Sequence, residues 1–385
     1  MRCSASRLFS LLTALAVLLS VSCGKQDPVP DPDPPEPVDP NPPSVYKYGL
    51  RELARANDLL LGTAFTYSEY NMDQPLKEVL KRDFDAVTFG NEMKHDGIVQ
   101  ADGSLRFQTA DTMVGWLKDC DAQLFGHTLG WHSQQQTDYL DKMIREAPDA
   151  ATAASRIREL HKSWVDAMID HFDAYGWDVV NEVLMDNGEW RSTANTPAGR
   201  HIFVWGNYYP GGTKEFVDAA FRSAQEALKR NGKQAILYIN DYNLEGGWAK
   251  AKLEALCSYA ESNPDVTGVG SQMHISSDMN RDDFVNMLKR MVKTGKMVRI
   301  SELDVKQDQT DQGETIVFIF DQYLKLVPKE QRGGITFWGV SDKNTWLNST
   351  SSRREYPLLY DAAYNRKDCY RKLHAYLLAR AGLEF

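Results

Sequence analysis

Two stretches decide the fold of this 385-residue chain: Trp177-Asp178-Val179-Val180-Asn181-Glu182 and Val298-Arg299-Ile300-Ser301-Glu302-Leu303-Asp304. In each, a short apolar run rich in β-branched residues ends in a carboxylate, which predicts a buried parallel strand with an acid at its end. A barrel of parallel strands carries its functional residues at that carboxyl end. One acid of this kind is also typical of a plain surface strand, or of an ion-pair network. Two of them favour a shared cleft.

Further apolar runs alternate with helical patterns on both sides of these stretches. The expected strands are 59–66, 84–91, 123–131, 177–183, 235–243, 268–275, 297–305 and 334–340, and the expected helices are 76–83, 113–119, 151–175, 213–231, 248–262, 281–294 and 314–327. Helix-length connections predict parallel pairing, and eight strands are the number that closes a barrel. No Gly-x-Gly-x-x-Gly follows the first strand, which argues against a dinucleotide-binding sheet. We predict the α/β class, with a single (β/α)8 TIM barrel over residues 46–385.

The amino-terminal 45 residues predict export rather than a fold. In residues 1–22, two arginines precede an apolar segment that is short for a membrane span, which indicates a signal peptide. Ser20-Val21-Ser22-Cys23 resembles the lipobox of bacterial lipoproteins and predicts lipidation of Cys23; an ordinary secretory signal cut nearby is the alternative. Residues 23–45 predict an extended proline-rich linker. We expect a lipid anchor in the bacterial outer membrane, on its periplasmic or surface face.

Composition limits the partners of the chain. Loss of residues 1–22 removes two arginines and takes the formal net charge from −9 to −11, which disfavours binding to nucleic acid or to anionic lipid. Beyond the signal and Cys23, Cys120, Cys257 and Cys369 are odd in number and lack metal-ligand spacing, so they predict buried free thiols. We expect a monomer without cofactor or metal, in contact with a membrane only through its anchor.

Polar and aromatic side chains gather where seven of the predicted strands end. Buried polar groups cost free energy unless they are paired, so stability alone does not explain so many at one face. The candidates, in strand order, are Asn91 and Lys94, His127 and Trp131, Asn181 and Glu182, Tyr242, Gln272 and His274, Glu302 and Asp304, and Trp338.

Two carboxyl groups that face one cleft are the smallest set of catalytic groups needed to cleave a glycosidic bond. One must be protonated to give a proton to the leaving oxygen, and the other must be ionised. A histidine at 274, oriented by Asp304, would keep Glu302 ionised, so we expect Glu302 to be the nucleophile and Glu182 the acid/base. Asn181 is a candidate donor to the sugar 2-hydroxyl.

From Leu50 to Leu378 the chain resembles glycoside hydrolase family 10, the endo-β-1,4-xylanases, through motifs in family order: FDAVTFGNEMK, GHTLGWH, WDVVNE, YINDYN, VGSQMHI, ISELDV, ITFWGVSDKNTWL and PLLYD. The resemblance implies endo-hydrolysis of xylan by a retaining double displacement, with Glu182 as acid/base and Glu302 as nucleophile. It implies sugar-holding or orienting roles around subsites −2 and −1 for Asn91, Lys94, His127, Trp131, Asn181, Gln272, His274, Trp338 and Trp346, and an aglycone-side position for Tyr242.

Two positions depart from the family pattern. Gly90 stands where a glutamate is usual and His95 where a tryptophan is usual, and both positions are expected to border the −2 sugar. The subsite is then weakened or adapted to a substituted chain, or neighbouring loops supply substitutes. Two other functions stay open: a catalytically silent glycan-binding lipoprotein on the same barrel, and a related β-1,4-glycanase acting on a β-glucan or mannan.

Overall fold

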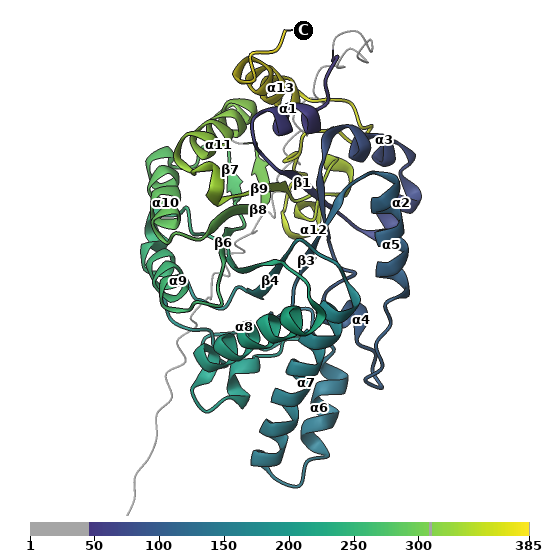
Figure 1. Cartoon of the computed structure of the whole chain (residues 1–385), viewed down its shortest axis with the longest axis vertical. Coiled ribbons are helices and arrows are strands. Elements are labelled where there is room, and N and C mark those ends of the chain that lie inside the picture. Colours follow the sequence, from purple (N-terminus) through teal and green to yellow (C-terminus); the bar gives the residue numbers. More distant parts are fainter. Residues whose placement is uncertain (1–45, 308–309, 385) are drawn as a thin grey trace, which may run out of the picture. The chain divides into compact units, whose positions relative to one another are not determined.

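Eight short apolar runs form parallel strands that close on themselves (Figure 1). The computed structural model describes residues 46–307 and 310–384. In that part of the chain, β6 pairs with β8 and β9 pairs with β1, which closes the barrel. The barrel strands are β1 (Leu61–Phe65), β2 (Ala86–Phe89), β3 (Gln123–His127), β4 (Gly176–Asn181), β5 (Ile236–Asp241), β6 (Gly268–Ser271), β8 (Met297–Lys306) and β9 (Arg332–Phe337). The predicted (β/α)8 barrel is confirmed.

Helices surround the barrel and connect its strands. The α-helices are α1 (Leu50–Ala56), α2 (Tyr67–Met72), α3 (Gln74–Asp83), α4 (His95–Ile98), α5 (Gln108–Asp119), α6 (Thr137–Arg145), α7 (Ala150–His171), α8 (Gly212–Asn231), α9 (Lys250–Ser262), α10 (Arg281–Lys293), α11 (Gln312–Leu326), α12 (Leu347–Thr350) and α13 (Asp368–Arg380). Short 3-10 turns are η1 (Trp205–Tyr208), η2 (Gly247–Ala249), η3 (Lys329–Gln331) and η4 (Asp342–Asn344). The seven expected helices are present, whereas α1, α2, α4, α6, α12 and α13 were not predicted.

The sixth predicted strand is not continuous. The chain leaves β6 after Ser271, and Met273 takes a left-handed backbone conformation with φ of 65°. The strand then resumes as β7 (His274–Ser276), which pairs with β8 so that His274 stands opposite Asp304. Pattern alone predicted one strand over 268–275, because no glycine or proline marks the break between Ser271 and His274. This break places residue 274 beside residue 304.

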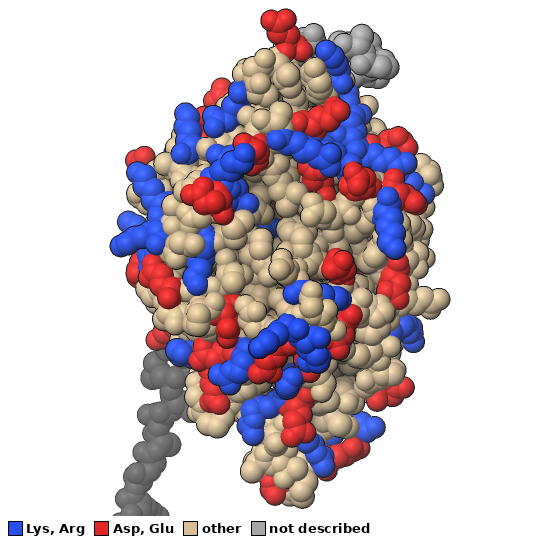
Figure 2. Space-filling model, in the orientation of Figure 1, with Lys and Arg blue, Asp and Glu red and all other residues tan. Residues whose placement is uncertain are grey.

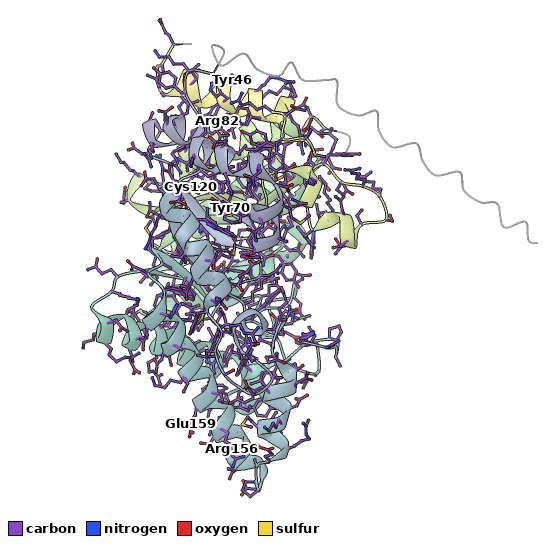
Figure 3. The ribbon with its side chains drawn as sticks, turned by 90° about the vertical axis from the view of Figure 1, so that its right-hand side faces the viewer. Tyr46, Tyr70, Arg82, Cys120, Arg156 and Glu159 are labelled. Carbon is purple, nitrogen blue, oxygen red and sulfur yellow. The ribbon has the colours of Figure 1, made fainter. Side chains whose placement is uncertain are left out.

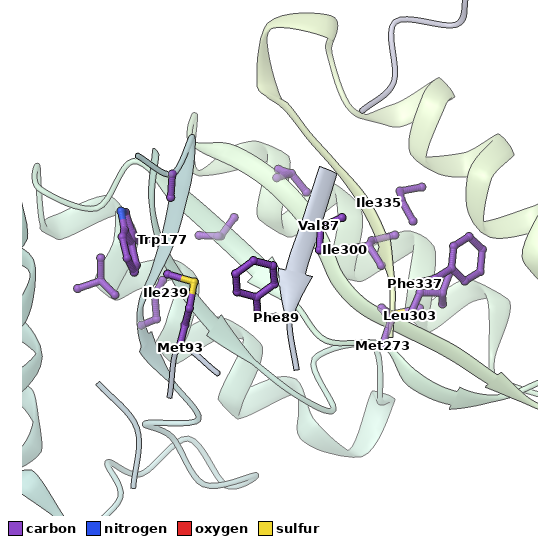
Figure 4. Close-up of a cluster of buried hydrophobic side chains, with 14 of the residues drawn as sticks. Val87, Phe89, Met93, Trp177, Ile239, Met273, Ile300, Leu303, Ile335 and Phe337 are labelled. Carbon is purple, nitrogen blue, oxygen red and sulfur yellow. The ribbon is translucent and has the colours of Figure 1, made fainter. Parts of the chain in front are cut away.

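An apolar core lies between the barrel strands and the helices that surround them. Val87, Trp177, Ile239, Ile300 and Phe337 come from five different strands and are buried together (Figure 4). Burying each such side chain contributes about 1.5–3 kcal/mol relative to leaving it exposed. Within the described residues, the three cysteines that remain after the amino-terminal segment are free and buried, as predicted.

A buried carboxylate ties the two ends of the barrel domain together. Asp83, at the end of α3, accepts hydrogen bonds from the Leu50 backbone amide at the start of α1 and from the hydroxyls of Tyr360 and Tyr370. Arg82 also donates to this carboxylate. Residues that precede β1 and residues that follow β9 are therefore fixed to one point.

On the face shown in Figure 2, acidic and basic side chains are interspersed. No helix among the described residues combines the length and the apolar character that a bilayer crossing requires. The predicted signal peptide, Cys23 and the linker over residues 23–45 lie outside the described residues.

Candidate active site

A cleft of about 610 Å³ opens at the carboxyl ends of the barrel strands, a size ordinary for small-ligand sites. Of the thirteen sequence-predicted catalytic and binding residues, only Asp304 does not line it; it is fully buried behind His274. The predicted residues that line the cleft are Asn91, Lys94, His127, Trp131, Asn181, Glu182, Tyr242, Gln272, His274, Glu302, Trp338 and Trp346.

Glu302 lies on β8 and is held as a carboxylate by His274. The Nε2 atom of His274 is 3.4 Å from Oε2 of Glu302, and its Nδ1 atom is 2.7 Å from Oδ2 of Asp304. Burial would raise the pKa of Glu302, but the hydrogen bond from His274 and the charges of nearby basic side chains outweigh it, so the pKa is lowered. Burial would lower the pKa of His274, but Asp304 and Glu302 outweigh it and raise that pKa to about 10.

Asn240, at the end of β5, is a second support for Glu302. Its Nδ2 atom donates to Oε1 of Glu302 at 3.1 Å and to Oδ1 of Asn181 at 3.0 Å. Its own Oδ1 accepts from the Ser301 hydroxyl at 2.7 Å, which fixes the orientation of the amide. One carboxylate oxygen of Glu302 thus faces Asn240 and the other faces His274.

Glu182 follows β4 in a strained backbone conformation, with φ of 56°. Such a conformation in a residue other than glycine costs roughly 1–3 kcal/mol and recurs at functional sites. Arg191 donates to the Glu182 carbonyl at 2.7 Å, which holds the turn. At the side chain, Gln272 donates to Oε1 at 3.0 Å and Asn181 donates to the same oxygen at 3.4 Å. Glu182 therefore projects into the cleft from a fixed turn.

Lys94 carries positive charge into the cleft from the segment after β2. Its Nζ atom donates to Oε1 of Gln134 at 2.6 Å and lies 5.0 Å from the centre of the Trp131 ring. Gln134 in turn donates to Oδ1 of Asn91 at 3.1 Å. Burial lowers the pKa of Lys94, although the charges of Glu302 and Glu182 oppose that change.

Aromatic residues form the walls around the two glutamates. Trp346 donates from its indole nitrogen to Oδ2 of Asp304 at 2.8 Å, and its ring meets that of His274 edge to face. The Trp338 ring lies edge to face with His127, whose Nδ1 atom is 2.8 Å from Oδ2 of Asp178. Asp304 thus orients both Trp346 and His274, whereas Asp178 orients His127, against which Trp338 packs.

His127, Asp178 and Glu302 each bring one donor atom to within 4.8 Å of the others, a grouping that could hold a metal ion. Each member already has hydrogen-bond partners: His127 and Asp178 bond each other, and Glu302 bonds His274 and Asn240. Hydrogen bonding therefore accounts for the cluster as part of the cleft.

A buried lysine positions Tyr242, which directly follows β5. The Nζ atom of Lys252, fully buried in α9, lies 3.4 Å from the centre of the Tyr242 ring and 2.7 Å from Oδ1 of Asp241. Arg191 reaches the Tyr242 hydroxyl at 3.4 Å. Arg191 thus connects the Tyr242 ring to the Glu182 turn.

Gly90 and His95, the two departures from the family pattern, have different surroundings in the structure. Gly90 lines the cleft, as expected. The expectation that position 95 borders the cleft is wrong: His95 is 5% exposed, packs edge to face against Trp164 and Trp205, and accepts from the Gln136 backbone amide. The first turn of α4 directs this side chain toward α7, so it fills core space.

The predicted set lacked several residues that line the cleft or hold its side chains in place: Glu69, Gln134, Asn240, Asn243 and Lys252. Asn240 belongs to the YINDYN motif at the end of the fifth predicted strand, so its place in the barrel was visible, but its orientation toward Glu302 was not. Gln134 lies in the loop after β3 and Glu69 lies in α2 after β1, and no spacing in those segments signals a cleft position.

Known proteins resemble this chain in both sequence and fold. A model of glycosyl hydrolase family 10 matches residues 49–376. The endo-β-1,4-xylanase Xyn10C of Cellvibrio japonicus is 30% identical over 362 residues, covering 84% of this chain and 56% of that protein. Native xylanase 10B of Thermotoga maritima has a TM-score of 0.73 at 28% identity, covering 87% of this chain and 99% of that one.

Xylanase 10B of Thermotoga petrophila in complex with xylobiose has a TM-score of 0.72 at 27% identity, covering 86% of this chain and 98% of that one. The chain spans little more than half the length of the curated Cellvibrio relative, and less of several others.

Proposed function

This chain belongs to glycosyl hydrolase family 10, and from that premise we propose that it hydrolyses β-1,4-xylosidic bonds within xylan with retention of configuration. The observation that carries the proposal is the contact of His274 with Glu302, which keeps a buried carboxylate ionised and ready to attack. A xylobiose complex of a relative with the same fold supports the substrate class.

In the proposed reaction, the Glu302 carboxylate attacks the anomeric carbon while Glu182 gives its proton to the leaving oxygen. The products of this step are a shortened chain and a glycosyl ester on Glu302. Glu182, now a carboxylate, takes a proton from a water molecule that attacks the ester, and Glu302 leaves as a carboxylate. Double inversion retains the configuration.

The remaining lining residues have proposed roles in holding the sugar. Lys94 and Asn91 offer donors on the β2 side, and Trp338 and Trp346 offer aromatic faces above the cleft. Tyr242 lies beyond Glu182, where the leaving sugar would stack. Asn181 donates one of its two amide N–H groups to Glu182 without substrate, which leaves the second for the proposed bond to a sugar 2-hydroxyl.

We also propose that the chain is exported, lipidated at Cys23 and held at the cell envelope by the linker over residues 23–45, as a monomer. The signal-like segment and the small residues before Cys23 support this. Membrane fractionation of the native host tests it: wild-type protein should sediment with membranes and Cys23→Ser should not. Equal distribution of the two proteins would contradict lipidation.

Product analysis on linear xylan and arabinoxylan tests the activity. Wild-type protein should release oligosaccharides with new reducing ends, and Glu302→Ala should release none. Glu159→Ala is the matched control, because this exposed glutamate lies near the middle of α7 and does not line the cleft (Figure 3). Faster hydrolysis of carboxymethyl-cellulose or mannan than of xylan would overturn the substrate. Retention on insoluble xylan without any hydrolysis would favour a silent glycan-binding protein.

A further inference from the structure

One acid in the cleft has no part in the proposed reaction. Glu69 lies in α2, directly after β1, and lines the cleft with Thr66, Gly90 and Asn344. Its neighbours on this wall are short or polar, which is the lining that sugar hydroxyls require.

One oxygen of the Glu69 carboxylate accepts hydrogen bonds within the protein, and the other is available to accept them from a ligand. Oε2 accepts from the Thr66 backbone amide at 2.5 Å and from the Thr66 hydroxyl at 2.9 Å. Oε1 accepts no hydrogen bond from any residue in the described ranges 46–307 and 310–384. Burial raises the pKa of Glu69 to about 7 against the hydrogen bonds from Thr66. A desolvated carboxyl with a free oxygen gains stability from a ligand that donates to it.

The Thr66–Glu69 pair occupies the space next to Gly90. A β-carbon built on Gly90 would lie 2.9 Å from Cγ2 of Thr66, closer than such atoms approach in real structures. A side chain at position 90 and the present position of Thr66 therefore exclude each other. On this wall of the cleft, Glu69 of α2 supplies the carboxylate. The family pattern would place a glutamate at position 90, directly after β2, where this chain has Gly90.

The helix that carries Glu69 is fixed to the barrel. The Tyr70 ring stacks on Trp116 of α5 at 4.0 Å between centres, and Tyr70 also meets Cys120 (Figure 3). Asp73, at the end of α2, accepts hydrogen bonds from Asn344 and Tyr364. Glu69 thus has a rigid base, which a residue that orients substrate needs.

The place of Glu69 relative to the scissile bond follows from the proposed roles. Glu182 protonates the leaving oxygen, so the leaving sugars lie beyond it, over β4 and β5, where Tyr242 stands. Glu69 follows β1, which stands opposite β5 in the closed barrel, and it lines the same cleft as Asn91 and Asn344. The sugars on the non-reducing side of the bond lie there.

We propose that Glu69 is a specificity-determining residue that accepts hydrogen bonds from hydroxyl groups of the xylose at subsite −2. This assignment rests on the proposed xylan hydrolysis. Because it acts on the second sugar, Glu69 affects substrates that fill subsite −2 and leaves unaffected those that fill only subsite −1.

The test compares an aryl β-xylobioside, which fills subsites −2 and −1, with an aryl β-xyloside, which fills only −1. The variant is Glu69→Gln, since glutamine at this position of a capping box can still accept from the Thr66 amide and preserve α2. The control is Glu78→Gln, at an exposed position on α3. For Glu69→Gln, kcat/KM on the xylobioside should fall about ten-fold, the effect of one hydrogen bond to a charged group.

The same variant should cleave the xyloside as the wild type does. An unchanged rate on the xylobioside, or an equal fall on both substrates, would overturn the assignment, since the second result indicates a purely structural role. Wild-type protein that cleaves neither glycoside and releases nothing from xylan would overturn the proposed function itself. Because that outcome concerns only the wild-type protein, it is distinct from the outcomes for the Glu69→Gln variant.

Discussion

The Nε2 atom of His274 lies 3.4 Å from Oε2 of Glu302, and these two residues come from different strands, β7 and β8. The contact depends on the strand break at Met273, which brings His274 opposite Asp304 in the parallel pairing. A histidine whose pKa is raised to about 10 by two carboxylates carries its charge at neutral pH. The fold thereby provides Glu302 with a permanent cationic neighbour.

Replacing His274 with alanine should move the acidic limb of the kcat/KM profile to higher pH. The substitution removes a hydrogen bond and a charge that lower the pKa of Glu302, so protonation of Glu302 would begin at higher pH. Loss of one hydrogen bond to a charged group corresponds to a shift of about 1–2 pH units. The pH dependence of xylobioside hydrolysis measures it. His171→Ala, at the end of α7, serves as control; an unmoved acidic limb in His274→Ala would contradict this account.

Replacing Asn240 with alanine should lower kcat/KM about ten-fold or more, because Glu302 loses a charge-assisted hydrogen bond. KM should change little, since Asn240 is fully buried and does not line the cleft. Steady-state kinetics on xylotetraose measure both quantities. Asn71→Ala, at an exposed position of α2, is the matched control. A change confined to KM would argue that Asn240 acts on substrate binding instead.

Replacing Glu182 with alanine should affect substrates according to their leaving group. A dinitrophenyl xylobioside needs no protonation to leave, so its glycosylation rate should persist, whereas xylotetraose hydrolysis should fall about 10²–10⁴-fold. Azide should accelerate turnover of the aryl substrate and give a β-configured glycosyl azide. Pre-steady-state kinetics and product analysis would detect both. An equal loss on the two substrates would argue against Glu182 as the acid.

Replacing Asp83 with alanine should destabilise the barrel by about 3 kcal/mol, since a buried network around a carboxylate is broken. Denaturant unfolding monitored by tryptophan fluorescence measures the change. Asp111→Ala removes an exposed side-chain contact with the His171 imidazole and should cost only about 0–1 kcal/mol. Equal effects of the two substitutions would contradict the claim that Asp83 ties α1 to the segment after β9.

The sequence predicted the barrel and most of the cleft because strand ends are visible in it. Apolar runs mark where strands stop, and in a parallel barrel all strands stop at the same face, so Glu182 and Glu302 could be brought together without coordinates. Motif order then added residues such as Trp346, which lies outside any predicted strand.

Side-chain direction and strand register could not be predicted in the same way. His95 was expected at the cleft, yet its helical turn directs it into the core among Trp164 and Trp205. Asn240 and Glu69 were missed because their roles depend on which neighbour their polar atoms reach. Those contacts arise from packing between elements distant in sequence.

Trapping the covalent intermediate would show whether Glu302 is the nucleophile of a retaining reaction. An activated 2-deoxy-2-fluoro-xylobioside should inactivate the wild-type protein and add one fluoroxylobiosyl group, and peptide mass spectrometry should place the group on Glu302. Glu302→Ala should gain no such mass. A label on another residue, or turnover to a product of inverted configuration without a label, would contradict the account.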